Sequence, residues 1–424
     1  MPELAVLADD LTGGMIIASK LEAEGVACPL VTDPAAFASL PDDLEAVVLA
    51  RKIRLVAPDA ARAEARAAAA AFAGARTIYF KYSALFDSTD QGNIGPIAET
   101  LLEAVGARRT LFCPAYIDRG VTVYKGRLFA GATPISETSK RFDPATPAFT
   151  SDVVARLRAQ TAREVGLIDH QMLASGPAAI VAMLDARAQT PLWVADAIDE
   201  NDVDLLASLT RGWPLITGAD SLAPAILRER LAGRDRRGAG RRLLPATPGG
   251  EVVLAGSCAE ATLGQLDLFA EAYPAWRVDL ARDGDDEAAA DAIAAWAAEH
   301  LPRGPVAVAT SAGREGVAAA QQVFGREGAA LRADRLLGEV ARRLRELGVR
   351  KFVVAGGETS GAVFAALGVE RLDVAAYDEL WGGYCQDPSA SPTSFVVKPG
   401  TMGEADFFFR ALGRMREAEG GSKP

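Results

Sequence analysis

Several features that mark particular protein classes are scarce in this 424-residue chain. It has only two histidines, His170 and His300, so a histidine-based metal site or catalytic triad has little material. The four cysteines stand far apart without a C-x-x-C spacing, which indicates neither a zinc site nor a disulfide framework. No uninterrupted run of about 18 apolar residues occurs, and the N-terminus lacks a signal-peptide pattern. We therefore expect no membrane span and a cytoplasmic location.

Lysine and arginine are also outnumbered by aspartate and glutamate, 45 to 56. The net charge is −11 and the isoelectric point is near 5.0, which leaves no surplus of lysine and arginine to neutralise nucleic-acid phosphates. One basic cluster, Arg228–Arg242, is interrupted by glycines and is typical of a solvated linker. We expect a small-molecule ligand, no nucleic-acid partner and no membrane partner, and the composition leaves a homo-oligomer open.

Short apolar runs alternate with alanine-rich helical patterns over most of the length. Continuous apolar runs of this kind are typical of parallel strands buried on both faces, and their alternation with helices predicts a doubly wound α/β fold. The clearest runs are Leu4–Asp9, Ala46–Arg51, Thr77–Tyr82, Arg109–Ala115 and Thr190–Asp196. A polar, glycine- and proline-containing stretch at 116–150 interrupts the alternation and predicts a hairpin at Val121–Leu128 within long loops.

The alternation resumes after the arginine- and glycine-rich stretch, which predicts two domains. We expect an N-terminal domain at 1–230, a linker at 231–250 and a C-terminal domain at 251–424. Both domains are predicted to be doubly wound α/β, and the cleft between them is the default ligand site.

The second half places small-residue turns at the ends of its predicted strands. "VVAGGETSGAVFAALG" joins a strand to a helix through Gly356, Gly357, Glu358, Thr359 and Ser360. Glycines allow a ligand close to the backbone, and a helix N-terminus favours an anion. "LAGSC" and "ATSAG" add similar turns, and together they favour a nucleotide; Ser/Thr helix caps are the structural alternative.

The first half places charged side chains at its strand ends. Asp9 and Asp10 follow the first strand, and Lys81 and Asp87 follow the third. Carboxylates beside hydroxyls can bind a polyhydroxy substrate or accept a proton from an attacking hydroxyl. Helix caps are the alternative for Asp10, Asp90 and Asn93. Arginines and lysines in nearby loops are candidate partners for a substrate carboxylate; they are Arg54, Arg119, Lys125 and Arg127.

These stretches resemble the four-carbon acid sugar kinases, and the resemblance runs nearly end to end. It is carried by "ADDLTG", "KYSALFDSTDQGNIGP", "CPA", "TVYKGRLF" and "ISETSKRFDPATP" in the first half. In the second half it is carried by "LAGSCAEAT", "GGETSGAV" and "KPGTMGEADFF". The resemblance implies an N-terminal acid-sugar-binding domain and a C-terminal ATP-binding domain, with Mg²⁺-ATP phosphorylating a hydroxyl of a sugar acid.

The resemblance also assigns site residues. ATP is expected at Ser257, Gly356–Ser360 and Gly403, and no metal ligand is assigned. The acid sugar is expected at Arg54, Lys81, Arg119 and Arg127, and a proton acceptor is expected among Asp9, Asp10 and Asp87.

The chain departs from the family pattern at three places. Ile16 stands where a third aspartate is usual, Val121 replaces an arginine, and Pro399, Thr401 and Met402 change the terminal Lys-Ser-Gly-Asn-Phe-Gly signature. Loss of polar contacts predicts an altered substrate preference. Two alternatives to a kinase therefore stay open, namely a lyase, isomerase or other transferase on the same scaffold, and a non-catalytic ligand-binding protein.

Overall fold

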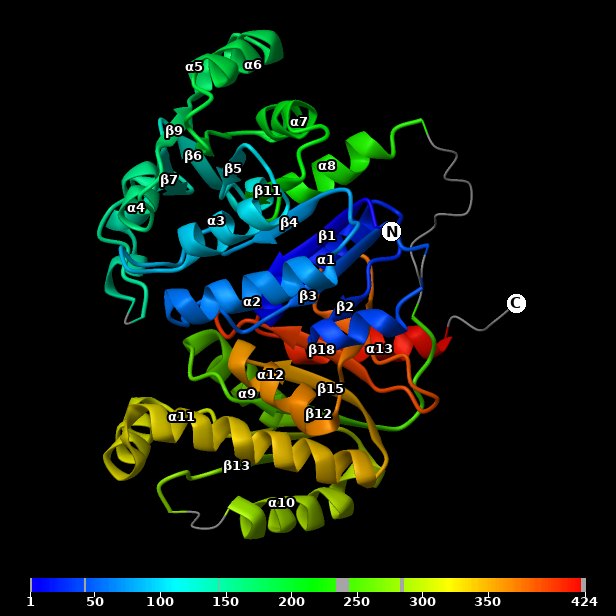
Figure 1. Cartoon of the computed structure of the whole chain (residues 1–424). Helices are drawn as coiled ribbons and strands as arrows, with labels where there is room; N and C mark the ends of the chain where they lie inside the picture. The colour runs from blue at the N-terminus through cyan, green and yellow to red at the C-terminus, as the bar shows by residue number, and fades with distance from the viewer. Residues whose placement is uncertain (1, 42, 144, 234–243, 283–285, 421–424) are drawn as a thin grey trace. The chain divides into compact units, whose positions relative to one another are not determined.

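The computed structural model describes residues 2–41, 43–143, 145–233, 244–282 and 286–420. It divides the chain into two compact units, Met1–Gly240 and Arg241–Pro424 (Figure 1). Residues 234–243 of the expected linker, and with them part of the Arg228–Arg242 cluster, lie outside the described residues, so the linker stays a prediction. Each unit has its own sheet and core, which confirms a two-domain α/β chain.

The first unit is built on one sheet whose neighbouring strands all run parallel. Its order is β2-β3-β1-β4-β11-β5-β10-β9. The strands are β1 Leu4–Ala8, β2 Leu30–Val31, β3 Ala46–Ala50, β4 Ile78–Lys81, β5 Thr110–Cys113, β9 Val165–Ile168, β10 Leu192–Ala195 and β11 Leu215–Gly218. All five expected runs form strands, and their side chains are buried on both faces as continuous apolar runs predict.

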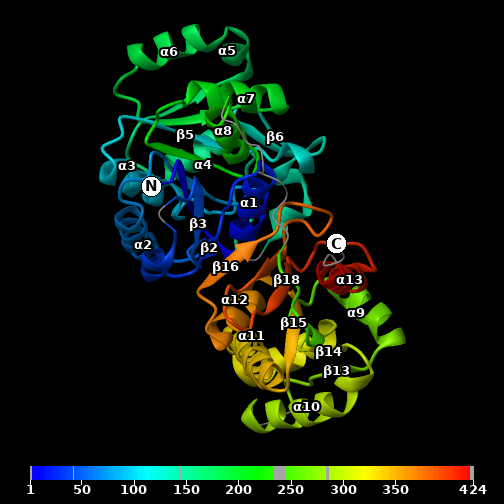
Figure 2. The same cartoon turned by 90° about the vertical axis from the view of Figure 1, so that its right-hand side faces the viewer.

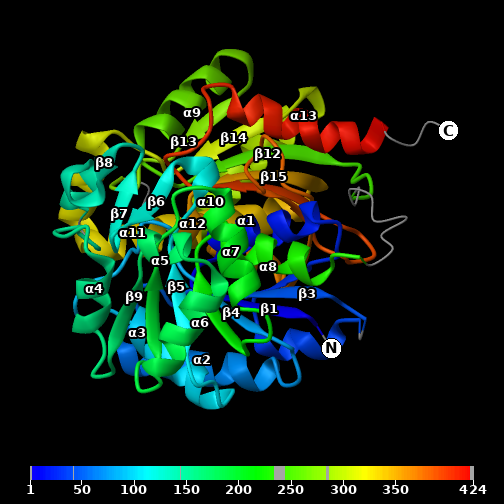
Figure 3. The same ribbon diagram turned by 90° about the horizontal axis from the view of Figure 1, so that it is seen from above.

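Helices cover both faces of this sheet. Figure 3 shows α2 and α3 on one face and α1, α7 and α8 on the other. The helices of the unit are α1 Leu11–Ala23, α2 Pro58–Ala71, α3 Ile94–Ala104, α4 Val153–Ala159, α5 His170–Ala174, α6 Pro177–Ala186, α7 Glu200–Leu209 and α8 Leu222–Arg230.

The expected hairpin lies within the loop-rich stretch. Strand β6 (Val121–Tyr124) pairs antiparallel with β7 (Arg127–Ala130), and a short β8 (Thr133–Pro134) extends them. The two-residue turn consists of Lys125 and Gly126, whose φ angles are 51° and 69°. Positive φ at both positions gives the tight turn that matches strand twist.

The second unit has a sheet that is parallel in its first part. Its order is β13-β14-β12-β15-β18-β17-β16, with β17 antiparallel to both neighbours. The strands are β12 Gly250–Ala255, β13 Ala275–Arg277, β14 Val306–Ala309, β15 Val349–Ala355, β16 Arg371–Val374, β17 Tyr384–Gln386 and β18 Ser394–Lys398.

Figure 2 shows α11 and α12 on one side of this sheet and α9 and α13 on the other. The helices are α9 Glu260–Ala272, α10 Asp286–His300, α11 Arg314–Glu346, α12 Gly357–Leu367 and α13 Phe407–Gly420. Gly325 has a non-helical φ of 70° within α11, so this helix consists of two parts that meet at a kink. Among the described residues, no helix is long and apolar enough to cross a membrane.

Both sheets change winding direction at their first strand. In the first unit β1 lies between β3 and β4, and in the second β12 lies between β14 and β15. The chain first adds strands to one side of this central strand and then crosses to the other. The carboxyl ends of strands at such a switch point border a crevice where α/β proteins bind ligands.

Candidate functional site

Asp9 lies at the carboxyl end of β1 and binds Arg54. The side chain of Arg54 donates from Nε to Oδ2 of Asp9 at 2.9 Å and from Nη2 to Oδ1 at 2.8 Å. Burial raises the pKa of Asp9, and the adjoining guanidinium opposes this increase. The backbone carbonyl of Asp9 also accepts from the N–H groups of Ile53 and Arg54. This bidentate pair fixes the loop after β3 against the end of β1.

Asp10 has two roles in the structure. Its Oδ1 accepts a hydrogen bond of 2.8 Å from the backbone N–H of Gly13, so the cap expected as the structural alternative is present at the start of α1. The same oxygen lies 2.9 Å from Nη2 of Arg54. Asp10 therefore joins the charged cluster as well as capping the helix.

Lys81 ends β4 and is almost fully buried beside Asp220. Its Nζ lies 3.4 Å from Oδ1 of Asp220, which follows β11, the strand next to β4. Burial raises the pKa of Asp220, and Lys81 opposes this increase. A Cβ at Gly13 would lie 2.5 Å from Nζ, so only glycine there leaves room for the lysine. Sequence reasoning missed Asp220, although it follows an apolar strand just as Asp9 does.

Asp87 lies on the loop after β4 and contacts two polar groups. Ser83 donates from its hydroxyl to Oδ2 at 2.6 Å, and Nζ of Lys140 lies 2.7 Å from Oδ1. Lys140 belongs to the quoted "ISETSKRFDPATP" stretch but was not singled out as a site residue. Asp87 also adds to the electrostatic field at Arg54, which places it with the other carboxylates.

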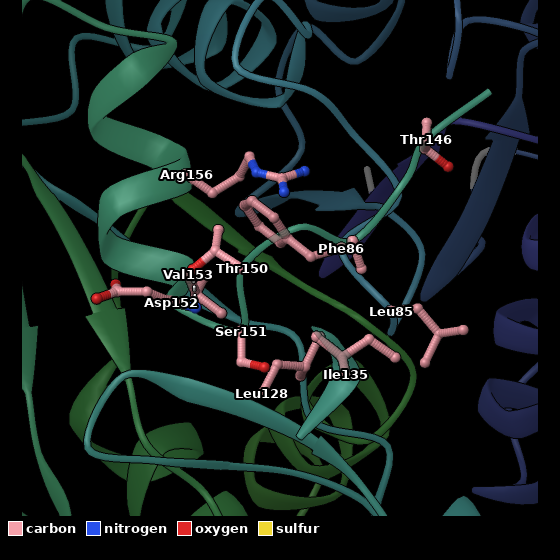
Figure 4. Close-up of a pocket in the computed structure, with 11 residues that line it drawn as sticks. Leu85, Phe86, Leu128, Ile135, Thr146, Thr150, Ser151, Asp152, Val153 and Arg156 are labelled. Atoms are coloured by element: carbon pink, nitrogen blue, oxygen red, sulfur yellow. Dashed lines mark hydrogen bonds between the residues drawn. The ribbon is translucent and has the colours of Figure 1, made fainter. Parts of the chain in front are cut away.

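The backbone before Asp87 is held in an uncommon conformation. Phe86 has a φ of 52°, a left-handed value that is strained for a bulky residue. Its ring packs edge-on against Tyr82 at 5.3 Å and borders a small pocket of about 10 Å³ beside Leu128 and Arg156 (Figure 4). This pocket is too small for a sugar ligand. The residues that line it hold Phe86 in place, and the backbone conformation of Phe86 sets the direction in which the side chain of Asp87 projects.

The other basic candidates lie near the hairpin. Arg119 is half-buried in the short 3₁₀ helix Ile117–Arg119 that follows β5. Arg127 is exposed on β7, and its guanidinium lies 3.9 Å from Asp152. The structure thus places Arg127 on the hairpin and not beside Asp9 and Arg54. Val121 and Ile16, which replace polar family residues, both pack in or against the apolar core of the unit.

In the second unit, the glycine turns after β12 and β15 touch. A Cβ at Gly256 would lie 2.1 Å from Oγ1 of Thr359, and Gly356 has a φ of 129°. Helix α12 begins at Gly357 with Gly356 as its cap residue, so the Ser/Thr cap alternative is wrong here. Thr359 instead donates to Oδ1 of Asp334 at 2.9 Å. The N-terminus of α12 thus lies at the end of β15, where the sequence predicts an anion site.

Two further expected nucleotide residues lie close to these turns. Ser257 follows Gly256 directly, and a Cβ at Gly400 would lie 1.8 Å from its Oγ, so the turn after β18 packs tightly on this serine. Gly403 lies in the same turn with a φ of 89°, and a Cβ there would lie 2.6 Å from the ring of Phe407. Both glycines are therefore required by shape.

A large cavity opens beside the first of these turns. Its volume is about 770 Å³, which suits a nucleotide. It begins at Gly256 and Cys258 after β12 and continues past Thr310 and Ser311 after β14. The segment Val278–Arg282 and the first part of α11 complete its wall. Sequence reasoning found the turns, but it did not find the wall, because α11 and the segment after β13 carry no motif.

Comparison with known families matches the two units to two different domain models. Residues 4–226 match the sugar-binding N-terminal domain model, and residues 252–408 match the nucleotide-binding C-terminal domain model. The first range contains the Asp9–Arg54 cluster, and the second contains the cavity and the glycine turns.

Curated relatives match over almost the whole chain. A 3-oxo-tetronate kinase of Burkholderia multivorans is 38% identical over 97% of each chain, and one of Pseudomonas fluorescens is 38% identical over 98% of this chain and 97% of its own. A 3-oxo-tetronate kinase of Salmonella typhimurium is 32% identical over 97% of this chain and 99% of its own.

Solved structures match as well. A Salmonella typhimurium protein described as a tRNA synthase superposes with a TM-score of 0.83 at 32% identity, covering 96% of this chain and 98% of that one. A Haemophilus influenzae protein superposes with a TM-score of 0.77 at 27% identity, covering 96% and 99%. The two domain models agree with the kinase relatives and not with a synthase. The chain belongs to the four-carbon acid sugar kinase family.

Proposed function

We propose that this protein transfers the γ-phosphoryl group of ATP to a hydroxyl of a small sugar acid of the 3-oxo-tetronate type. The observation that carries the proposal is the full-length match to 3-oxo-tetronate kinases, with the matched motifs placed at the strand ends of both units. The charged cluster of the first unit serves the acid, and the turns and cavity of the second serve the nucleotide.

Arg54 is the group best placed to bind the substrate carboxylate. Its Nε and Nη2 are occupied by Asp9 and Asp10, whereas Nη1 makes no hydrogen bond within the described part of the chain. A guanidinium held on one edge by a buried carboxylate is preorganised to receive a second carboxylate. Lys81 and Asp220 form a buried ion pair that fixes the floor of this site.

Asp87 is the carboxylate best placed to orient the attacking hydroxyl. Both oxygens of Asp9 accept from Arg54, and Asp10 caps a helix, so these two are committed to positioning. Asp87 projects from a strained turn and has Lys140 beside it, so a developing negative charge on the hydroxyl oxygen would be partly neutralised. In phosphoryl transfer such a carboxylate receives the hydroxyl proton.

Mg²⁺ fits this site as a companion of ATP. Within the described residues, no group of three or more His, Cys, Asp or Glu side chains is arranged to hold a metal ion. Mg²⁺ commonly keeps water ligands and binds through phosphates plus one or two carboxylates, which needs no preformed cage. When bound, it would neutralise charge on the phosphates, and Ser257 with the Gly356–Ser360 turn would hold the phosphate oxygens.

The proposal is tested by ADP release from ATP in the presence of a panel of four- to six-carbon sugar acids. We expect release with a 3-oxo-tetronate or a close relative and none with the matching neutral sugars and polyols, because Arg54 needs a carboxylate. Release that no acid stimulates, from folded protein that binds ATP, would contradict the proposal. Absence of ATP binding would favour the non-kinase alternatives.

A further inference from the structure

Lys398 is a buried lysine at the end of β18 that bonds only to uncharged acceptors within the described part of the chain. Its Nζ donates to the carbonyl oxygens of Pro399 at 3.0 Å, Gly400 at 3.1 Å and Met402 at 3.0 Å. It also donates to Oγ1 of Thr262 at 3.0 Å. These four acceptors share the three N–H groups of one ammonium. Within the described residues no carboxylate pairs with it, and a buried charge without a partner is costly.

Helix α9 completes the same arrangement. Thr262 donates from Oγ1 to the carbonyl of Gly400 at 2.7 Å. Gln265 donates from Nε2 to the carbonyls of Met402, Gly403 and Glu404 at 3.2, 2.9 and 2.9 Å. The carbonyls of Pro399, Gly400, Met402, Gly403 and Glu404 therefore face inward, toward Lys398 and α9.

The geometry of the peptide bond decides where the N–H groups of this turn point. In a trans peptide the N–H is directed opposite to the preceding carbonyl. Inward carbonyls of Gly400, Met402 and Gly403 direct the N–H groups of the residues that follow them outward. Thr401 and Glu404 are exposed, so this outward side is accessible. The N–H of Met402 donates to the carbonyl of Pro399 within the turn, so the outward N–H groups are those of Thr401, Gly403 and Glu404. Backbone N–H groups that point outward in this way beside Ser257 are suited to bind an anion.

We propose that Lys398 is a positioning residue for the nucleotide phosphates: its ammonium holds the carbonyls of Pro399, Gly400 and Met402 inward, and the phosphate charge compensates the ammonium. The inference rests on the nucleotide-binding part of the proposed function and not on the identity of the acid. It explains why a lysine survives at this point although three of the following residues differ from the family signature. The turn is held through its backbone carbonyls, which any residue supplies.

Among the residues that the structure describes, the other groups around Lys398 are uncharged. On α9 they are the hydroxyl of Thr262 and the amide of Gln265, on α13 the ring of Phe407 at 5.8 Å, and on β15 the neighbouring Ala355. Burial lowers the pKa of Lys398 to about 8. A bound phosphate favours the charged form, so the lysine should take up a proton when a nucleotide binds near pH 8.5.

The test is calorimetric titration of the full chain with ADP, without any sugar acid, at pH 8.5 in two buffers of different ionisation enthalpy. Wild-type protein should take up part of a proton on binding. Lys398→Met should lose this uptake and bind ADP about tenfold to a hundredfold more weakly, as expected for loss of a charged hydrogen-bond donor. Lys398→Arg should retain most of the affinity but lose the uptake, because arginine does not titrate in this range.

Lys351 supplies the matched control. It is equally buried in β15, but it lies toward the other end of the sheet beside Glu251 at 3.6 Å. Lys351→Met should leave both ADP affinity and proton uptake at the wild-type values.

Two results would overturn the proposal. One is a proton uptake in Lys398→Arg equal to that of wild type, and the other is an ADP affinity of Lys398→Met within twofold of wild type. If Lys398→Met does not fold, the arginine variant alone decides. Normal nucleotide results without transfer to any acid would instead contradict the proposed function.

Discussion

Individual carboxylates in the first unit have different surroundings, and these separate their roles. Asp9 is hydrogen-bonded to Arg54, and Asp10 caps α1. Asp220 pairs with Lys81, whereas Asp87 lies on a strained turn beside Lys140. The sequence predicted the strand-end position of Asp9, Asp10 and Asp87. It did not distinguish them, because the partner of each comes from a distant part of the chain.

Asp87→Asn tests the assignment of the proton acceptor. The amide keeps the shape but cannot take the hydroxyl proton, so kcat should fall about 10²- to 10⁴-fold, with a small change in KM for the acid. Steady-state kinetics with saturating ATP measures both. Asp152→Asn, beside Arg127 on the hairpin, is the control and should retain full activity. A normal kcat in Asp87→Asn would move the role to Asp10.

Arg54→Met removes the partner of a buried carboxylate. Asp9 would be left with an uncompensated charge, and breaking such a pair typically costs about 3–5 kcal/mol of unfolding free energy. The pKa of Asp9 should rise further because the group that opposes the effect of burial is gone. Urea denaturation measures the loss. Arg54→Lys should restore part of the stability but little of the acid affinity, since lysine lacks the planar two-edged donor set.

Lys398 also makes stability depend on pH. Its pKa is about 8 in the folded chain, against 10.5 for a lysine in water. Between these values the unfolded chain binds more protons than the folded one, so the free energy of unfolding should rise with pH from 8 toward 10.5. The slope from this residue is at most about 1.4 kcal/mol per pH unit. Denaturation at pH 7.5 and 9.5 should show a larger increase in unfolding free energy for wild type than for Lys398→Met. An equal change in both proteins would contradict this prediction.

At the scale of elements, the residue that caps α1, Asp10, is also proposed to lie in the acid-binding site. Asp10→Ala should cost about 1 kcal/mol of stability through the lost hydrogen bond to Gly13 and should also weaken binding of the acid. Asp199→Ala removes the equivalent cap of α7 and is the matched control. Both variants should lose similar stability in urea denaturation, but only the first should raise KM for the acid. An equal effect on KM would mean that Asp10 is a cap alone.

Much of the element order could be predicted from the sequence, for a physical reason. Parallel strands buried on both faces must be apolar throughout, and β1, β3, β4, β5 and β10 meet this condition visibly. The hairpin was predicted by its glycines and its position in a polar stretch. Strands β9 and β11 were missed because "VGLI" and "LITG" contain a glycine and lack the aromatic side chains of the equally short β4, β5 and β10.

The same limit applied to the site. Asp220 contacts Lys81 only because β11 lies next to β4 in the sheet. Lys398 bonds to the carbonyls of the turn that follows it only because α9 packs on that turn. Neither adjacency has a signature in the local sequence. The residue pattern supplied the glycine turns and the resemblance supported them, but neither could supply contacts made by side chains outside the motifs.

At the scale of the whole molecule, each unit has its own core and its own ligand. Hydrogen exchange should therefore respond separately to the two reactants. ADP should protect amides in 252–408, above all near Ser257 and the Gly356–Ser360 turn, whereas the acid should protect amides in 4–226 near Asp9 and Arg54. Mass spectrometry of exchanged peptides measures this. Protection of the Asp9 and Arg54 peptides by ADP alone would contradict the assignment of ligands to units.

The two sheets start with the same order, in which the first strand lies between the third and the fourth and the second lies outside the third. One order of four strands thus underlies two unlike ligand-binding sites, since the loops beyond the strand ends and the remaining strands of the two sheets differ. Substrate preference can consequently drift by exchange of loop residues while the strands stay untouched. Val121 and Pro399 both lie outside these four strands of their units, so the departures from the family pattern leave the shared strand order intact.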